Sequence, residues 1–213
     1  MKRNAPTILV LLLLAATATA FAVTQRLKLE PSPISQTHVD KVFSPVCNCA
    51  TKVAHIDFSI RRADHLRIVV RTPSGPVVIA NRDFPKGMVH VQWNGRGPRR
   101  DVVADATYFA VVRLRHAQRT IDLPNPIRVD TVKPTIALTG TQRDGAKTIF
   151  LYRTSEAAHA LLIVDGERRV RTYNTRRHGR LPYYRPISAK TKLVLRARDL
   201  AGNLSRPVKI PSL

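Results

Sequence analysis

The feature that most constrains this chain is a series of short segments, beginning at residue 54, in which apolar and polar residues alternate. In the first segment, Ala54–Ile60, every second residue is apolar. Successive side chains of a β-strand point to opposite faces, so this pattern predicts strands with one buried and one solvated face. Sequences such as Asp144-Gly145 and Asp165-Gly166 separate later segments, and Asp-Gly between strand-like runs is typical of a hairpin. The sequence therefore predicts an all-β fold built from β-sandwiches.

The expected strands fall into two groups, one on each side of residues 130–134, and 213 residues leave room for one or two domains. We expect one sandwich over residues 46–129 and a second over residues 130–213. Residues 26–45, which include the irregular stretch PSPISQTHVD, are expected to form a linker or stalk. In the second group the expected strands are Thr135–Leu138, Lys147–Tyr152, Ala158–Val164, Arg168–Thr172 and Leu193–Arg198, and the region around His178-Gly179 is expected to be a turn.

Residues 1–25 have the character of a membrane-directed leader. Lys2 and Arg3 precede an uncharged run whose apolar part, Pro6–Val23, would span roughly 27 Å as a helix, close to the hydrocarbon thickness of a bilayer. A cleaved signal peptide is one interpretation, with small residues at 18–20 or 20–22 as the cleavage motif. We favour the other, an uncleaved signal anchor that forms a transmembrane helix, because the apolar run continues to Val23 before Arg26.

The flanking charges predict the orientation of such an anchor. Lys2, Arg3 and the amino terminus lie before the apolar run, and Arg26 and Lys28 lie after it. The positive-inside rule then places the N-terminus in the cytoplasm and the rest of the chain outside the membrane. The body would be a single-pass extracytoplasmic domain, or a secreted protein if the leader is cleaved.

The chain is strongly basic, with 36 Lys and Arg against 14 Asp and Glu and a formal net charge of +22. This excess favours an acidic partner such as nucleic acid, anionic lipid or an anionic cell-wall polymer. Of the 36 cations 26 are Arg, however, a bias that a GC-rich genome also produces through codon usage. The charge is therefore either functional or compositional.

The stretch from Trp93 to Tyr108 reads WNGRGPRRDVVADATY. It resembles the immunoglobulin-like (Ig-like) domain of flagellar hook-capping proteins and surface-protease repeats, in which Trp-Asp-Gly is followed at fixed spacing by Gly, Pro, Gly and Tyr. Trp93, Gly95 and Tyr108 match that pattern, whereas Asn94 and Ala106 depart from it. The resemblance covers roughly residues 50–129 and implies structural roles, with Trp93 buried between two sheets. No segment resembles the region through which the flagellar protein assembles, so a hook-capping role is not expected.

The second group of strands carries a resemblance of its own. Residues 130–134 at its start and residues 197–205 near its end resemble the boundary motifs of bacterial Ig-like repeats in surface proteins. Asp199 can accept backbone N–H groups in a turn, and Gly202-Asn203 suits a left-handed conformation. The whole chain resembles small membrane-anchored Ig-like surface proteins of actinobacteria, which implies two tandem Ig-like sandwiches and a location, but no activity.

The two cysteines, Cys47 and Cys49, are separated by one residue. Three states stay open for them: a disulfide, a reduced structural pair, or part of a soft-metal site. The nearest histidines are His38 and His55, and no further cysteine is present. Two exposed thiols do not persist for long in an oxidising compartment.

The densest basic run lies in the second group of strands, interleaved with tyrosines. Its arginines could bind phosphate or another anion, and its tyrosines could stack on a base or a sugar. The alternative is a solvated hairpin that needs no ligand. The candidate anion-binding residues are Arg168, Arg169, Arg171, Arg176, Arg177, Arg180 and Arg185.

Catalytic motifs for nucleotide binding, zinc peptidases and serine hydrolases are absent from the sequence. We therefore predict no enzymatic activity, no cofactor, no metal and no small-molecule substrate. The predicted function is that of a structural or adhesive surface protein that binds a cell-wall polymer or another surface protein. The alternative is a binder of an anionic polymer or nucleic acid through residues 168–185.

Overall fold

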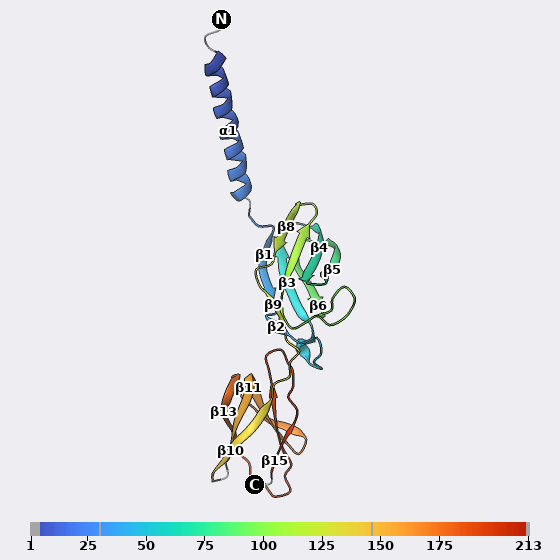
Figure 1. Ribbon diagram of the computed structural model, residues 1–213, viewed down its shortest axis with the longest axis vertical. Helices are drawn as coiled ribbons and strands as arrows, with labels where there is room; N and C mark the ends of the chain where they lie inside the picture. Colours follow the sequence, from blue (N-terminus) through green and yellow to red (C-terminus); the bar gives the residue numbers. More distant parts are fainter. Residues whose placement is uncertain (1–4, 30, 146, 212–213) are drawn as a thin grey trace.

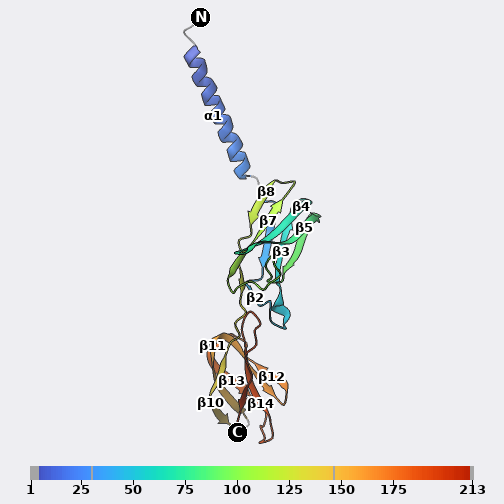
Figure 2. The ribbon, with the colours of Figure 1, turned by 45° about the vertical axis from the view of Figure 1, so that its right-hand side comes forward.

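The computed structural model describes residues 5–29, 31–145 and 147–211. Three parts follow one another along a long axis: helix α1 (Ala5–Leu29), a first β-rich module and a second β-rich module that ends near the C-terminus (Figures 1 and 2). The expectation of a mostly β fold in sandwich-like layers is confirmed.

Helix α1 extends away from the first module in both views (Figures 1 and 2). Its large apolar side chains from Val10 to Leu14, and Phe21, are exposed. Among the residues that the structure describes, no helix combines the length and the apolar character needed to cross a membrane. The transmembrane helix expected in residues 1–25 is not supported there.

The first module has two facing layers. Strands β1 (Ile34–Val39), β3 (Ala54–Ile60) and β6 (Gly87–Trp93) form a three-stranded antiparallel sheet. The other layer runs in the order β2 (Val42–Phe43), β9 (Ile127–Val129), β7 (Thr107–Leu114), β4 (Asp64–Thr72) and β5 (Gly75–Phe84), with β8 (Arg119–Asp122) also paired to β7. Only β2 and β9 pair in parallel among the described strands. The two sheets together form a sandwich-like arrangement.

The stalk expected at residues 26–45 is shorter than the sequence suggests. Strand β1 lies within it, and Phe43 is fully buried in the core. The strand escaped detection because its two buried residues, Ile34 and Val39, are an odd number of positions apart. A bulge between Ser35 and His38, with a positive φ at Gln36, breaks the two-residue period that identifies a strand.

The second module is organised around one long strand, β11 (Lys147–Val164). Its first part pairs with β10 (Ile136–Asp144) and β13 (Arg176–Tyr183). Its second part pairs with β12 (Glu167–Arg171) and β14 (Leu193–Arg198), and β15 (Val208–Ile210) pairs with β14. A register shift between Arg153 and Ala158 carries β11 from one layer to the other. The two strands expected at 147–152 and 158–164 are therefore one strand.

The turn expected around His178-Gly179 is also wrong, because both residues lie inside β13. Glycine is required there for packing rather than for a turn. A Cβ atom at Gly179 would lie 2.7 Å from the hydroxyl oxygen of Tyr152, which is buried in the core. The glycine thus allows β13 to lie directly over the Tyr152 ring.

Each module has its own hydrophobic core. One cluster draws its buried residues from positions 34–129 and the other from positions 136–210. The two clusters share no residue. The link between the modules therefore depends on residues 130–135 and on contacts between loops.

Candidate functional site at the module junction

Trp93 closes the end of the first core that faces the second module. Its ring is 1% exposed and makes edge-on contacts with Phe43 and Tyr108, at centroid distances of 5.5 and 5.1 Å. Its indole N–H donates a 3.1 Å hydrogen bond to the backbone oxygen of Arg96. The buried, hydrogen-bonded indole is structural, and it leaves no exposed ring to stack on a sugar.

Gly95 and Tyr108 support the same corner. Gly95 has a φ of +68°, and a Cβ atom there would lie 2.8 Å from the ring of Pro45. The hydroxyl of Tyr108, at the start of β7, donates a 2.7 Å hydrogen bond to the backbone oxygen of Ala104. This hydrogen bond ties the start of β7 back to the loop before it.

Cys47 and Cys49 are joined by a disulfide. The small loop that it closes lies against Gly202 of the second module. A Cβ atom at Gly202 would collide with Cys49 Sγ and Thr51 Oγ1. The hydroxyl of Thr51 donates a 2.6 Å hydrogen bond to the backbone oxygen of Ala201. The disulfide loop is therefore part of the interface between the modules.

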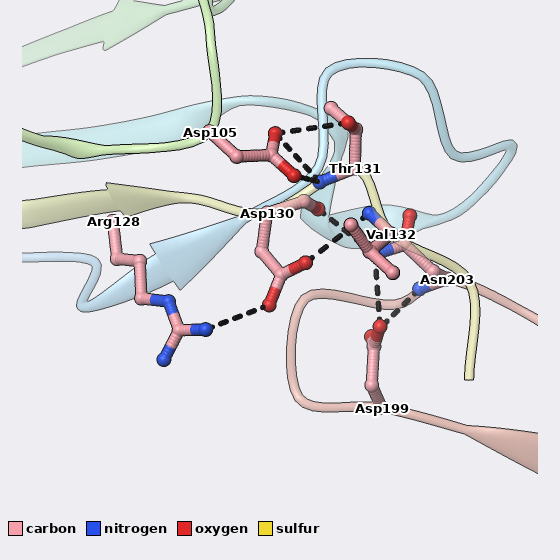
Figure 3. A network of polar contacts seen from close by, with 7 residues as sticks. All are labelled: Asp105, Arg128, Asp130, Thr131, Val132, Asp199 and Asn203. Atoms are coloured by element: carbon pink, nitrogen blue, oxygen red, sulfur yellow. Dashed lines mark hydrogen bonds and ion pairs between the residues drawn. The ribbon is translucent and has the colours of Figure 1, made fainter. Parts of the chain in front are cut away.

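Asp130, the residue at which the chain leaves the first module, is the centre of a polar network (Figure 3). Its carboxylate accepts a 3.2 Å hydrogen bond from the guanidinium of Arg128 and another of 3.2 Å from the backbone N–H of Val132. Its backbone oxygen accepts a 2.8 Å hydrogen bond from the side-chain amide of Asn203. One residue thus ties β9, the linker and a loop of the second module together.

The loop that follows β14 is held by Asp199 and Asn203, as Figure 3 shows. Both the backbone N–H and the side-chain amide of Asn203 donate 2.8 Å hydrogen bonds to the Asp199 carboxylate. Gly202, between them in this turn, has a φ of +97°. Asp199, Gly202 and Asn203, which belong to the motif identified in the sequence, therefore shape the surface that meets the first module.

The linker itself is clamped from the first module by Asp105. The backbone N–H of Thr131 lies 3.0 Å from each carboxylate oxygen of Asp105, and the Thr131 hydroxyl donates a 2.9 Å hydrogen bond to one of them (Figure 3). This clamp was not foreseen from the sequence. No local pattern connects residues 105 and 131, which the fold of β7 and β9 brings together.

Three carboxyl groups gather at the junction. Ligand atoms of Asp130, Glu156 and Asp199 lie within 4.8 Å of one another. Burial raises the pKa of Glu156, and the negative charges of Asp199 and Asp130 raise it further. Burial also raises the pKa of Asp199, more than its hydrogen bonds from Asn203 lower it. The ionised forms of Glu156 and Asp199 are therefore disfavoured at the junction.

An oxygen-rich group of this kind matches the ligand preference of a hard divalent cation. The carboxylates of Asp130 and Asp199, however, already accept hydrogen bonds from Arg128, Val132 and Asn203. These hydrogen bonds give the carboxyl cluster a structural role at the centre of the junction.

The predicted anion-binding arginines do not form one group. Arg171, Arg176, Arg177 and Arg180 line one hollow on the second module. Among the described residues, Arg168, Arg169 and Arg185 line neither this hollow nor the one beside it, and Arg169 is paired with Glu167 at 2.6 Å. Arg153, which the sequence reasoning missed, lines the neighbouring hollow.

No family model matches the chain, and no curated protein matches it. Solved structures similar to it include the BSP domain of a biofilm-associated protein, with 8% identity and a TM-score of 0.31 over 84% of this chain and 30% of that chain. Another is from work on host cell surface retention of a 1.5-MDa bacterial ice-binding adhesin, with 13% identity and a TM-score of 0.33 over 85% of this chain and 66% of that chain. A third is bovine butyrophilin, with 10% identity and a TM-score of 0.31 over 85% of this chain and 96% of that chain.

The chain thus spans less than a third of the biofilm-associated structure and about two thirds of the adhesin structure. TM-scores of this size are too low to transfer a role.

Proposed function

We propose that this protein is a non-enzymatic, extracytoplasmic structural or adhesive protein whose two Ig-like modules, with cores over residues 34–129 and 136–210, act as a rigid spacer. The junction between the modules is the observation that carries the proposal. Domains joined by a linker move relative to one another unless a substantial interface holds them. Here the linker is clamped by Asp105, and loops on both sides of it are hydrogen-bonded to one another.

The architecture supports a spacer in a second way. Helix α1 and the C-terminal module lie at opposite ends of the elongated chain (Figure 1). A rigid connection would hold the second module at a constant distance from the first. The partners in this proposal are a cell-wall polymer or another surface protein.

The location outside the cytoplasm rests on two observations. The Cys47–Cys49 disulfide is typical of an oxidising compartment. The basic start and apolar run of residues 1–25 have the pattern of a leader or membrane anchor. Protease added to cells with permeable walls should degrade the body of the chain. Protection of the body until the membrane is lysed would contradict this location.

The rigidity can be tested with a matched pair of glycine variants. Gly202 and Gly166 both have a positive φ, +97° and +88°, so Ala strains the backbone at each. Only at Gly202 does the added Cβ strike the other module, because nothing lies within 4 Å of a Cβ at Gly166. Residual dipolar couplings measured by NMR report whether two modules share one alignment tensor.

We expect one tensor to fit both modules in the unaltered protein and in Gly166→Ala. Gly202→Ala should require two tensors, since the loops can no longer meet. Two tensors in the unaltered protein would refute the rigid spacer. If Gly202→Ala unfolds the second module, Thr51→Val tests the same contact from the first module.

A further inference from the structure

Two adjacent hollows on the second module share a border. The first, of about 640 Å³, is lined by residues that include Thr135, Arg153 and Ser155. The second, of about 710 Å³, lies over β13 and the loop before it. Both are lined by Arg177 and His178, which form their common edge. They lie on the module opposite the N-terminal helix, where β10, β11 and β13 are labelled in Figure 1.

Together the two hollows carry a concentrated positive charge, which we call the β13 basic surface. None of the described residues that line either hollow is acidic. The β13 basic surface consists of Arg153, Arg171, Arg176, Arg177 and Arg180.

Neutral partners hold two of these arginines in place. A guanidinium nitrogen of Arg171 lies 2.9 Å from His159 Nε2, and Nδ1 of that ring lies 2.9 Å from the backbone oxygen of Thr172. The two contacts fit the neutral tautomer that donates from Nδ1 and accepts at Nε2. Arg180 donates a 2.9 Å hydrogen bond to the side-chain oxygen of Gln142. Neither partner is an anion, so both guanidinium charges stay available.

The charges of the remaining three arginines are not paired with a carboxylate in the described part of the chain either. Among the described residues, Arg153, Arg176 and Arg177 form no ion pair within hydrogen-bonding distance. Glu156 feels the charge of Arg177, but only as a minor influence on its pKa. None of the five arginines would therefore have to release a carboxylate of the described residues before it pairs with a ligand anion.

The backbone beneath the β13 basic surface is well supported. The buried hydroxyl of Thr154 has its shortest contact, 2.6 Å, with the backbone oxygen of Glu156, and it also lies 3.0 and 3.1 Å from the backbone oxygens of Arg176 and Arg177. Gly179 packs directly on Tyr152, as described above. A supported strand fixes the backbone from which the arginines project, which limits the backbone entropy lost on binding.

An aromatic side chain stands at the rim of the larger hollow. Tyr173 lines that hollow and is 95% exposed. Its ring makes almost no contact with the rest of the protein, so packing does not explain its presence. An exposed aromatic ring beside cations suits a ligand that has both a ring face and negative charge.

We propose that the β13 basic surface binds an acidic polysaccharide, with Tyr173 stacking on a sugar ring and the arginines pairing with its acidic groups. Single-stranded nucleic acid is a poorer fit, because proteins that bind it stack successive bases on several aromatic side chains. Tyr173 is the only exposed Phe, Tyr or Trp among the described residues that line the hollows. The disulfide also favours an oxidising compartment, where acidic glycans are accessible.

This binding site goes beyond the spacer role and does not depend on it. The test measures binding of the full chain to polygalacturonate, polyglutamate and duplex DNA at several salt concentrations. One triple variant replaces Arg153, Arg176 and Arg177 with Gln. The matched control replaces Arg168, Arg169 and Arg185 with Gln, which removes the same charge from the same module but outside the hollows.

The first triple variant should weaken binding to polygalacturonate about tenfold, from the loss of three exposed charge pairs, and the control should weaken it much less. Tyr173→Ala should weaken binding to polygalacturonate but leave binding to polyglutamate unchanged, because only the former has a sugar ring. Thermal melting shows whether each variant is folded, and single Arg→Gln variants replace any triple variant that is not.

Equal losses from the two triple variants would overturn the site and leave a diffusely basic surface. Equal effects of Tyr173→Ala on both acidic polymers would overturn the stacking role. Tighter binding of DNA than of polygalacturonate at the same salt, lost in the first triple variant, would assign the surface to nucleic acid and overturn the proposal.

Discussion

The hydroxyl of Thr51 in the first module and the backbone carbonyl of Ala201 in the second are joined by a 2.6 Å hydrogen bond across 150 positions of sequence. Thr51 lies two residues after Cys49 of the disulfide loop, and Ala201 directly precedes Gly202. The bond therefore connects the two loops that face one another at the junction. Single hydrogen bonds contribute only about 1 kcal/mol net, so the junction depends on this bond together with those of Asp130 and Asp105.

The first prediction concerns this hydrogen bond. Thr51→Val keeps the shape of the side chain but removes the hydroxyl, which leaves the Ala201 carbonyl without that donor. We expect the coupling between the modules to fall by about 1 kcal/mol, with both cores intact. Urea denaturation of each module, followed separately by NMR, measures that coupling. Thr141→Val, on an exposed position of β10, is the matched control, and an equal effect there would contradict the role of Thr51.

The disulfide loop leads to a second prediction. Its contact with the other module places the sulfur of Cys49 beside Gly202. Reduction, or replacement of both cysteines by Ser, should allow the loop to relax and should loosen the junction. The first core should change little, because no sulfur belongs to its hydrophobic cluster. Small-angle scattering should show a wider range of module arrangements after reduction. An unchanged scattering profile would show that the loop keeps its shape without the covalent bond.

The sequence predicted the fold best where side chains alternate without interruption. Ala54–Ile60 and Gly87–Trp93 bury every second residue, as a half-buried strand requires. Prediction failed where the local period is broken. Because of the bulge in β1, the sequence pattern predicted a stalk where a strand lies. Because of the register shift in β11, it predicted two strands where there is one. Both irregularities are compensated by pairing with distant strands, which a local pattern does not reveal.

The basic surface shows a similar limit. The sequence grouped seven arginines because they are close along the chain. The seven lie on β12, on β13 and in the segment that follows β13, and only four of them line a hollow. Arg153 joins them because it is the register partner of His178 across β11 and β13. Proximity in sequence is therefore a weak guide to a binding surface on a β-sheet.

A third prediction concerns Trp93, the only Trp in the chain. Trp93→Ala removes a fully buried ring that contacts both Phe43 and Tyr108. We expect a loss of about 3–5 kcal/mol in the stability of the first module, from lost burial and the remaining cavity. Circular dichroism during urea denaturation measures it, since the intrinsic Trp fluorescence is lost with the residue. Trp93→Phe should cost less, and an unchanged midpoint for Trp93→Ala would contradict the structural role.

The last prediction concerns pH. In the folded protein the pKa of Glu156 is raised above its ordinary value of 4.5, by burial and by the charges of Asp199 and Asp130. As pH rises from that ordinary value through the raised folded pKa, the unfolded chain loses its proton first. The unfolding free energy of the second module should therefore fall over this window, and mild acidification from neutral pH should restore it.

The pKa of Asp64, in the first module, is shifted in the opposite direction, so its effect on stability depends on pH in the opposite way. Although burial alone would raise its pKa, hydrogen bonds from the backbone of His116 and Ala117 hold the pKa below the ordinary 3.8. Its contribution to stability is present above pH 3.8 and is lost as pH falls through the lowered pKa. Acidification should thus first stabilise the second module and then, at lower pH, destabilise the first.

Glu156→Gln separates the two effects, because Gln carries no charge at any pH. The variant should raise the stability of the second module at neutral pH and flatten its dependence on pH between 4.5 and neutrality. Glu167→Gln removes the same charge from an exposed position that pairs with Arg169, and it is the matched control. Thermal melting across this pH range measures both variants. A fall in the neutral-pH stability of Glu156→Gln would mean that the ionised Glu156 stabilises the protein, for instance through the charges of Arg128 and Arg177. That result would contradict the conclusion that the junction disfavours the ionised form of Glu156.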